Sequence, residues 1–223
     1  MLLALNFKEN IVNFDDFLKK LEKTCVETVF FPCEQQLCMN AKLSNNQSFG
    51  IQDYSFYHNK IIDNNKVEYC LVGHSDRRYK RNESDNEVAQ KVKKCLVNNI
   101  TPILCVGEIR KTCDEETLAF LKRQIDECIS LVEPCETDKI IVAYEPVFCI
   151  GTGQVCDISH INMVVKFIKK HFDFLKVLYG GSVNELNSEE ILKNVLVDGF
   201  LVGNSALKPE KINKIAKIME NFS

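Results

Sequence analysis

Short apolar runs alternate with longer amphipathic stretches along the whole chain. Each run is about three to five residues long and lacks the polar alternation of a half-exposed strand, which is typical of strands buried on both faces of a parallel sheet. The runs are Leu2–Leu5, Thr28–Phe31, Phe49–Gln52, Tyr69–Val72, Ile103–Val106, Ile140–Tyr144, Val177–Tyr179 and Phe200–Val202. They predict eight buried parallel strands.

The stretches between these runs have the spacing of amphipathic helices. From Phe14 to Leu21, apolar residues recur at positions i, i+3, i+4 and i+7, and Asn13 or Asp15 can cap the first turn. The other predicted helices cover Asn86–Val97, Glu116–Val132, Ser159–Phe172, Ser188–Val195 and Pro209–Met219. Strands and helices are therefore expected to alternate from one end of the chain to the other.

Eight strands and about eight helices, without a linker or low-complexity segment, predict an α/β fold. We expect one (β/α)8 barrel with parallel strands, formed by residues 1–223 as a single domain. A doubly wound open sheet is the alternative that periodicity alone leaves open. The absence of a GxGxxG motif after the first apolar run argues against it.

Composition changes this picture little. The chain has 223 residues and a formal charge of −3, with 45% hydrophobic and 26% charged residues, which is ordinary for a soluble globular protein. There is no basic excess that would predict nucleic acid or an acidic membrane as a partner, although a local cluster of cations can still hold a phosphate. The N-terminus lacks the features of a secretory signal, and no apolar run approaches the roughly 20 residues that cross a bilayer.

The eleven cysteines are scattered, and no two of them form a CxxC pair. Cys70, Cys95 and Cys105 lie in apolar stretches, where cysteine behaves as a small hydrophobic residue. Reduced thiols fit this pattern better than disulfides or a metal site, and redox sensitivity is a lesser alternative. The chain is therefore predicted to be cytoplasmic and to bind no metal.

Chemistry is expected just after the strands, because these residues face the active site of a barrel. The candidates are Asn6 and Lys8; His74 and Ser75; Glu145; Gly180, Gly181 and Ser182; and Gly203, Asn204 and Ser205. They supply a carboxylate base, an imidazole, a cation and two glycine-containing loops of the phosphate-binding type. This set suits the abstraction of a proton next to a carbonyl in a small phosphorylated substrate.

Glu145 is the candidate base. A Glu before Pro is by itself more often a solvated loop residue, but the apolar tip between Pro146 and the flexible segment Gly151–Gly153 indicates a lid. A carboxylate beneath a closing lid loses water and becomes more basic towards a C–H group. His74 is the candidate electrophile and Lys8 the stabilising cation, although singly they are commonly a packed histidine and a surface lysine.

Six motifs, in an order that covers nearly the whole chain, carry a family resemblance. They are NFK at Asn6–Lys8, GHSDRR at Gly73–Arg78, CVGE at Cys105–Glu108, AYEPVFCIGTG at Ala143–Gly153, YGGSV at Tyr179–Val183 and DGFLVGNSALKP at Asp198–Pro209. Through them the chain resembles the triosephosphate isomerases, which have a (β/α)8 TIM barrel. The pair YEPV…IGTG and YGGSV is highly specific, whereas NFK or GHS alone is weak.

The resemblance implies interconversion of dihydroxyacetone phosphate and D-glyceraldehyde 3-phosphate through an enediol(ate), without a cofactor, in glycolysis and gluconeogenesis. This family is itself the standard example of a Glu base that works with a neutral His. By resemblance, Glu145 moves the proton between carbons, and His74 polarises the carbonyl. Lys8 and Asn6 contact the substrate. The phosphate is expected at the backbone of Gly151, Ser182, Gly203 and Asn204, the latch of the closed lid at Tyr179 and Ser182, and supporting groups at Ser75, Asp76 and Cys105.

Several positions depart from the usual residues of this family. Phe7 and Phe148 replace tryptophans, Asp76 a glutamate, Asn204 a glycine and Lys176 an arginine. The phenylalanines lose an indole N–H, and Asp76 has a shorter reach towards Lys8. Lys176 is expected to pair with Asp198, without the bidentate geometry of arginine. We expect these changes to tune rate and stability rather than abolish the chemistry.

The segment Asp53–Val67 is short where the family has a long loop that inserts into the neighbouring subunit. The family's homodimer is therefore expected to be weakened, which leaves open a dimer with a reduced interface, a monomer or a different oligomer. Two other functions also stay open. One is a phosphate-binding barrel enzyme of the aldolase or indole-synthesis type, which requires a Schiff-base Lys or a different acid–base pair at a strand end; the other is a non-catalytic binding protein. The set that favours the isomerase is Asn6, Lys8, His74 and Glu145.

Overall fold

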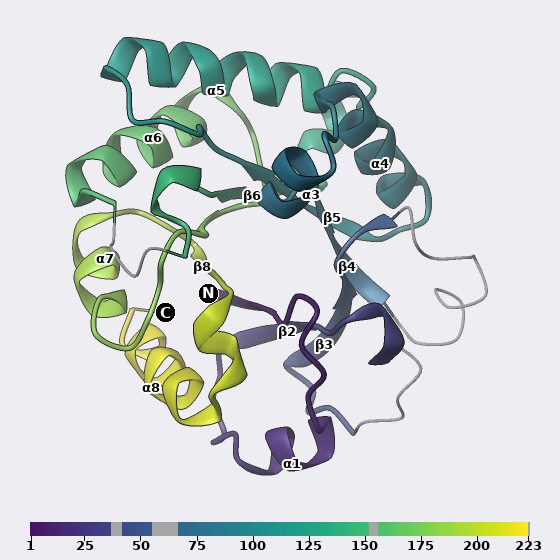
Figure 1. The fold of residues 1–223 in the computed structure, drawn as a ribbon, viewed down its shortest axis with the longest axis vertical. Helices are drawn as coiled ribbons and strands as arrows, with labels where there is room; N and C mark the ends of the chain where they lie inside the picture. The colour runs from purple at the N-terminus through teal and green to yellow at the C-terminus, as the bar shows by residue number, and fades with distance from the viewer. Residues whose placement is uncertain (37–41, 55–66, 152–155, 223) are drawn as a thin grey trace.

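The strands form a closed barrel (Figure 1) in a computed structural model that describes residues 1–36, 42–54, 67–151 and 156–222. All neighbouring strands pair in parallel and in chain order, and β1 closes the ring by pairing with β8. The strands are β1 (Leu2–Asn6), β2 (Glu27–Phe31), β3 (Gln47–Ile51), β4 (Val67–Val72), β5 (Thr101–Val106), β6 (Ile141–Tyr144), β7 (Lys176–Tyr179) and β8 (Gly199–Val202). The (β/α)8 TIM barrel is confirmed, and the open sheet is excluded because an open sheet keeps two unpaired edges.

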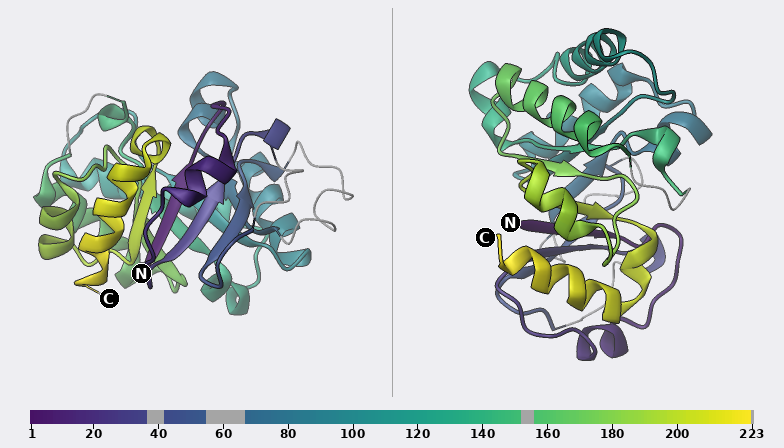
Figure 2. Two further views of the ribbon diagram at one scale, coloured as in Figure 1. Left: turned by 90° about the horizontal axis from the view of Figure 1, so that it is seen from below. Right: turned by 90° about the vertical axis from the view of Figure 1, so that its left-hand side faces the viewer.

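Helices lie along the outer face of the barrel (Figure 2). In the described residues they are α1 (Phe14–Lys19), α3 (Ser75–Lys80), α4 (Asp85–Val97), α5 (Asp114–Cys128), α6 (Ile158–His171), α7 (Ser188–Asn194) and α8 (Pro209–Glu220). Short 3₁₀ turns lie at Glu34–Gln36, Pro134–Lys139, Val147–Cys149 and Asn204–Leu207. Of the two predicted caps of α1, Asn13 is the correct one, because its side chain accepts a hydrogen bond from the Asp16 backbone N–H.

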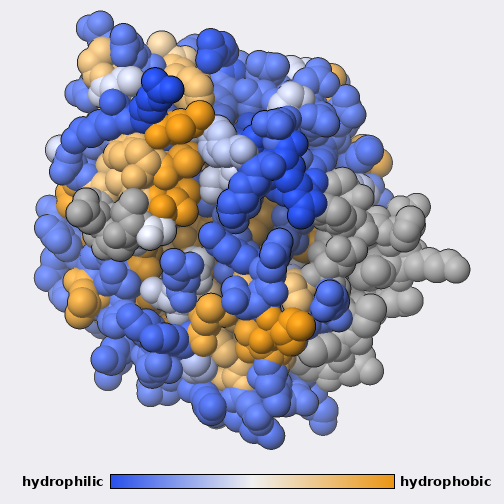
Figure 3. All heavy atoms as spheres, viewed as in Figure 1, coloured by the Kyte–Doolittle hydropathy of each residue, from blue (hydrophilic) through white to orange (hydrophobic). Residues whose placement is uncertain are grey.

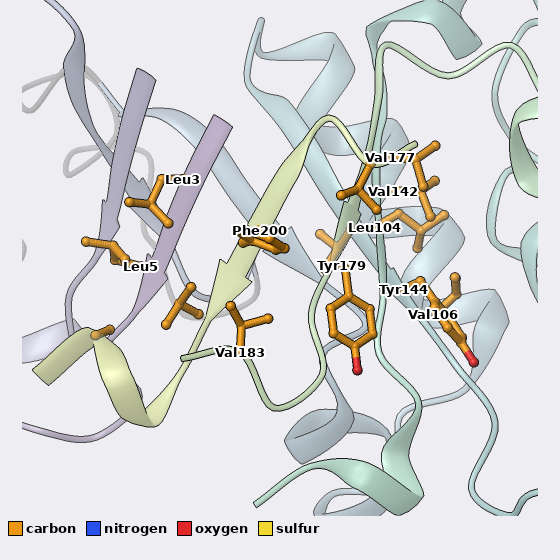
Figure 4. Close-up of a cluster of buried hydrophobic side chains, with 14 of the residues drawn as sticks. Leu3, Leu5, Leu104, Val106, Val142, Tyr144, Val177, Tyr179, Val183 and Phe200 are labelled. Atoms are coloured by element: carbon orange, nitrogen blue, oxygen red, sulfur yellow. The ribbon is translucent and has the colours of Figure 1, made fainter. Parts of the chain in front are cut away.

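The strands bury both of their faces, in two separate apolar layers. Successive side chains of a strand point to opposite faces, so Leu2 and Ala4 of β1 lie in the core inside the barrel, whereas Leu3 and Leu5 pack in the layer beneath the helices. Figure 4 shows part of this outer layer, including Tyr144. Burial on both faces explains why the apolar runs show no polar alternation.

The predicted helix Glu116–Val132 ends earlier than its apolar spacing suggests. The helix α5 ends at Cys128, and the backbone N–H groups of Ser130 and Val132 then bond to carbonyls three residues back, which is a turn pattern rather than an α-helical one. Ile129 and Val132 still pack against the core. Apolar spacing was therefore a good guide to burial at this point and a poor guide to the helix boundary.

Ion pairs at the N-terminal end of the barrel correct one prediction. Lys176, which begins β7, donates a hydrogen bond to Glu27 Oε2 at 2.5 Å. Asp198 instead accepts from the backbone N–H of Val177 at 2.7 Å and from Lys169 of α6 at 2.8 Å. The prediction of a Lys176–Asp198 pair is wrong, because Lys169 from the neighbouring helix reaches Asp198 and Glu27 lies within reach of Lys176.

The face of the molecule seen in Figure 1 is mostly hydrophilic, with separate hydrophobic patches (Figure 3). Within the described ranges, no helix has both the length and the apolar character that crossing a membrane requires. No disulfide bond joins the cysteines of these ranges, and Cys38 lies outside them. Residues 55–66 also lie outside them, so the expectation of a shortened segment at Asp53–Val67 falls largely on residues that the structure does not describe.

Candidate active site

A pocket of about 120 Å³ opens where β1, β4, β6, β7 and β8 end. Parallel strands all end on the same side of a barrel, so residues far apart in the sequence meet there. Predicted site residues that line the pocket are Asn6, Lys8, His74, Glu145, Gly151, Ser182, Gly203 and Asn204. The structure thus brings the candidate base, the imidazole, the cation and both glycine-containing loops together around one space.

Glu145 directly follows β6 and is only 3% exposed. Its Oε2 accepts a hydrogen bond from the Ser75 backbone N–H at 3.3 Å, and its Oε1 lies 3.3 Å from His74 Nε2. A Cβ at position 180 would lie 2.9 Å from Glu145 Cγ, so Gly180 provides the space that the carboxylate occupies. The candidate base therefore sits against the start of α3, beside the imidazole.

His74 is the N-cap of α3, and this position decides which of its nitrogens carries a proton. Its Nδ1 accepts a hydrogen bond from the Asp76 backbone N–H at 3.3 Å. Because a backbone N–H can only donate, Nδ1 is unprotonated in this arrangement and the proton of the neutral ring is on Nε2. Nε2 is also the ring nitrogen that lies next to Glu145, at the edge of the pocket.

Lys8 has a left-handed backbone conformation, with φ of 53°. Such a conformation is uncommon for a residue with a side chain and costs free energy, so the surroundings must hold it in place. The Asn6 side chain accepts from the Lys8 backbone N–H at 3.0 Å, and Gln52 donates to the Lys8 carbonyl at 2.8 Å. Sequence reasoning missed Gln52, although it ends the third predicted strand and the strand-end rule could have found it.

Asp76 links the candidate cation and the imidazole. Its Oδ2 lies 3.5 Å from Lys8 Nζ and 3.7 Å from His74 Nδ1, and its Oδ1 pairs with Lys80 at 2.6 Å. Partial burial by itself raises the pKa of Asp76, but the hydrogen bond from Lys80 and the neighbouring positive charges outweigh burial and lower the pKa. The long separation from Lys8 is what the shorter reach of an aspartate produces.

A second part of the pocket wall comes from the later part of the chain, and its Gly203 lies beside the Lys8 side chain. Gly151 has φ of 74°, which favours glycine. Asn204 is not among the residues with positive φ, so its side chain causes no backbone strain at a position where the resemblance expects glycine. Ser182 Oγ donates to the Cys149 carbonyl at 2.7 Å and so ties the loop after β7 to the segment after Glu145.

Tyr179 and Cys105 lie behind the pocket rather than in its lining. Burial raises the pKa of the Tyr179 phenol. Burial, followed by the negative charge of Glu145, raises the pKa of the Cys105 thiol, which therefore stays protonated. Part of the predicted lid, residues 152–155, lies outside the described residues.

Two further groups support the site and were not singled out by sequence reasoning. Arg78 is buried and donates from Nε to the Gly73 carbonyl at 2.7 Å and from Nη2 to the Cys105 carbonyl at 3.2 Å, so it fixes the chain before His74. Glu108 accepts hydrogen bonds behind β6. Both residues stand inside quoted motifs, GHSDRR and CVGE, but Cys105 is 27 positions from Arg78 and Tyr144 is 36 positions from Glu108.

The arrangement can move a proton and stabilise negative charge. A carboxylate, an imidazole N–H and an ammonium group surround one small pocket, which suits general base catalysis with an electrostatically stabilised oxyanion. Among the residues that the structure describes, no group of three or more His, Cys, Asp or Glu side chains is arranged to hold a metal ion.

Comparison with known proteins agrees with the geometry. The family model described as triosephosphate isomerase matches residues 1–219. Among curated proteins of that name, the one from Gloeobacter violaceus is 38% identical over 154 residues, which cover 67% of this chain and 62% of the relative. The protein from Buchnera aphidicola is 37% identical over 167 residues, covering 70% and 65%. The protein from Aquifex aeolicus is 40% identical over 157 residues, covering 66% and 63%. The chain thus spans less than two thirds of the length of these curated relatives.

Proposed function

Because this chain belongs to the triosephosphate isomerase family, we propose that it interconverts dihydroxyacetone phosphate and D-glyceraldehyde 3-phosphate. The observation that carries the proposal is the meeting of Glu145, His74 and Lys8 around one pocket. No second function is favoured by a specific observation. A Schiff-base enzyme requires a lysine for covalent bonding, whereas Lys8 faces Asp76 across 3.5 Å and is suited to charge stabilisation.

In the proposed reaction Glu145 removes a proton from the carbon next to the carbonyl and returns it to the neighbouring carbon. The Nε2 of neutral His74 gives its proton to the carbonyl oxygen and then takes up the proton of the adjacent hydroxyl. The enediol(ate) thus forms and collapses, and His74 returns to the protonation state in which it began. Lys8 stabilises the negative charge that develops on these oxygens. A Glu base with a neutral His is the family's standard pair, and the hydrogen bond from the Asp76 N–H to Nδ1 supports that tautomer here.

The phosphate is proposed to bind against the backbone of Gly151, Ser182, Gly203 and Asn204, in the part of the pocket wall that the later chain supplies. Backbone N–H groups and the start of a short helical turn favour an anion. The hydrogen bond from Ser182 to Cys149 supports a role of Ser182, with Tyr179, in latching the segment after Glu145.

We further propose a small phosphorylated triose as the only partner of the pocket, with no cofactor, since the reaction moves protons without net redox change. The proposed setting is cytoplasmic, in glycolysis and gluconeogenesis, with residues 1–223 as one domain. The proposed dimer is weaker than that of the family, because the segment between Asp53 and Val67 is short. Sedimentation that shows a tight dimer at micromolar concentration would contradict the weakened interface.

The function is tested by a coupled assay with D-glyceraldehyde 3-phosphate on the wild type and on Glu145→Gln. Loss of a general base is expected to lower kcat by about 10²–10⁴-fold. Glu133→Gln, which makes the same chemical change at an exposed position, is the matched control and should keep wild-type turnover. Equal turnover in Glu145→Gln would sink the mechanism. No turnover in the wild type would refute the isomerase and favour a different barrel enzyme or a binding protein.

A further inference from the structure

A buried polar cluster lies behind the candidate base, in the layer between the barrel and α6. Glu108, which follows β5, is 4% exposed, and His160 in the first turn of α6 is 6% exposed. Glu108 Oε1 accepts a hydrogen bond from the Tyr144 hydroxyl at 2.8 Å and lies 3.0 Å from His160 Nε2. None of the roles proposed above uses this cluster.

The protonation states of the cluster follow from its hydrogen bonds. Burial, and next the negative charge of Glu108, raise the pKa of the Tyr144 phenol well above its usual value, so Tyr144 is the donor. Because Glu108 Oε1 acts as the acceptor for Tyr144, we assign to His160 the tautomer in which Nε2 carries the proton and donates to the same oxygen. Both donors thus meet at a single carboxylate oxygen.

The cluster holds the chain on both sides of Glu145. Tyr144 immediately precedes the base and points into the outer layer, so Glu145, as the next residue, points towards the barrel mouth. On the other side of the base, the Val147 N–H donates to the backbone carbonyl of Glu108 at 2.9 Å. One residue, Glu108, therefore fixes the positions before and after the candidate base.

His160 extends this hold to the segment that follows. Its ring lies edge-on to the ring of Phe148, with centroids 6.1 Å apart and an interplanar angle of 77°. Phe148 carries no hydrogen-bond donor. His160 therefore contacts the apolar segment after the base through its ring. Through its Nε2–H the same ring is held by Glu108. In this way α6, the loop after β5 and the segment Val147–Cys149 are joined at one point.

We propose that Glu108 and His160 form a positioning pair that holds residues 144–148 so that the Glu145 carboxylate is aimed into the pocket. The proposal rests on the proposed isomerase function. It assigns to His160 an effect on the chemical step rather than on substrate binding, because His160 lies outside the pocket lining. A displacement of a reacting group by 1 Å can cost about 10²-fold in rate, so the hold on the base has a measurable consequence.

The first test compares His160→Leu, which removes the N–H, with His160→Gln, whose side-chain amide can still donate to Glu108. His160→Leu is expected to lower kcat by about 10–100-fold with KM within about twofold of the wild type. His160→Gln should recover kcat to within about threefold of the wild type. His171→Leu is the matched control, since it makes the same change at an exposed position of the same helix.

The second test reads the position of the segment without using activity. Alkylation of Cys149, next to Phe148, is followed by peptide mapping, with buried Cys128 of α5 as the internal reference. If the pair holds the segment, His160→Leu speeds alkylation of Cys149 by about tenfold or more and leaves Cys128 unchanged, because only a local opening is created. His160→Gln and His171→Leu should behave as the wild type.

A purely structural His160 gives a different result. In that case Cys149 and Cys128 become reactive together as the whole fold loosens, kcat per folded molecule stays at the wild-type value, and the positioning pair is refuted. Unchanged alkylation and unchanged kcat in His160→Leu refute it as well. A wild type without isomerase activity refutes the proposed function alone, since the alkylation test still decides whether the pair holds residues 144–148.

Discussion

The two ends of the barrel both place a lysine beside a carboxylate, but they pair these groups differently. At the N-terminal end, Glu27 accepts a hydrogen bond from Lys176 at 2.5 Å and a second one from the Tyr69 phenol. Asp198 there accepts from Lys169 at 2.8 Å. Every one of these charged groups meets a partner at close range, so this end is held together internally.

At the C-terminal end the distances between the groups that line the pocket and their partners are longer, although Asp76 also pairs with Lys80 at 2.6 Å. Glu145 lies 3.3 Å from His74, and Lys8 lies 3.5 Å from Asp76. These separations leave donors and acceptors that a ligand can take over. Lys8 also has a strained backbone. The difference shows how one scaffold separates stability from chemistry. Tight ion pairs stabilise the N-terminal end of the barrel, whereas loosely paired or strained groups remain available to a ligand at the C-terminal end.

The variant His74→Gln is expected to have the largest effect on turnover, and it would sharpen the contrast between the two ends of the barrel. The change removes the proposed electrophile and should lower kcat by about 10²–10⁴-fold in the coupled assay. Its effect on the urea midpoint should be limited to the loss of the hydrogen bond by which His74 caps α3. Tyr69→Phe is the counterpart at the other end and should leave kcat unchanged. Comparable turnover in the two variants would break the comparison.

Lys8→Gly is expected to have opposite effects on activity and stability. It removes the proposed cation and should lower kcat by about 10²–10³-fold. It also relieves the left-handed conformation, which should raise the free energy of unfolding by roughly 0.5–1 kcal/mol. Asn82→Gly is a matched control, because Asn82 has φ of 54° and lies outside the pocket lining. A loss of stability in Lys8→Gly, measured by urea unfolding, would contradict the claim that the Lys8 backbone is strained.

The smallest effect is expected for Glu27→Gln, which should leave kcat unchanged and lower stability at neutral pH. Partial burial by itself raises the pKa of Glu27, but the hydrogen bonds from Lys176 and Tyr69 outweigh it and lower the pKa. The carboxylate therefore stabilises the fold above its unfolded pKa, and this contribution is lost as the pH falls through the folded pKa. Because Glu27 is partly exposed, the effect should be at most about 1 kcal/mol.

Urea unfolding at neutral pH and at about pH 3, below the usual pKa of a Glu side chain, tests this sign. The difference between Glu27→Gln and the wild type should shrink in acid. A difference that grows as the pH falls would mean that the N-terminal end is not held by the ionised carboxylate.

The positions of the main site residues could be predicted because they depend on strand ends. Asn6, His74 and Glu145 each follow a short apolar run, and parallel strands in a closed barrel must end on one side. Helix ends were less predictable, since the apolar spacing through Val132 continues in a turn after α5 ends at Cys128.

Pairings between distant residues could not be predicted in the same way. Glu108 stood in a quoted motif, but nothing near it indicated His160, which is 52 positions away. The wrong prediction for Lys176 also concerned a pairing between distant residues. Lys169 of α6 pairs with Asp198 instead, and whether it can reach Asp198 depends on how the helix lies against the barrel.

The sequence by itself determined the barrel and the set of groups at its mouth, because apolar periodicity and strand order are local properties that add up along the chain. Only the tertiary structure decided which partner each group meets. Lys8 keeps its unusual backbone because Gln52, 44 positions away, holds its carbonyl. The base is anchored from behind by Glu108, which follows β5, and by His160 of α6. Hydrogen bonds and ion pairs depend on distances of a few ångströms in space, and spacing along the chain does not specify such distances.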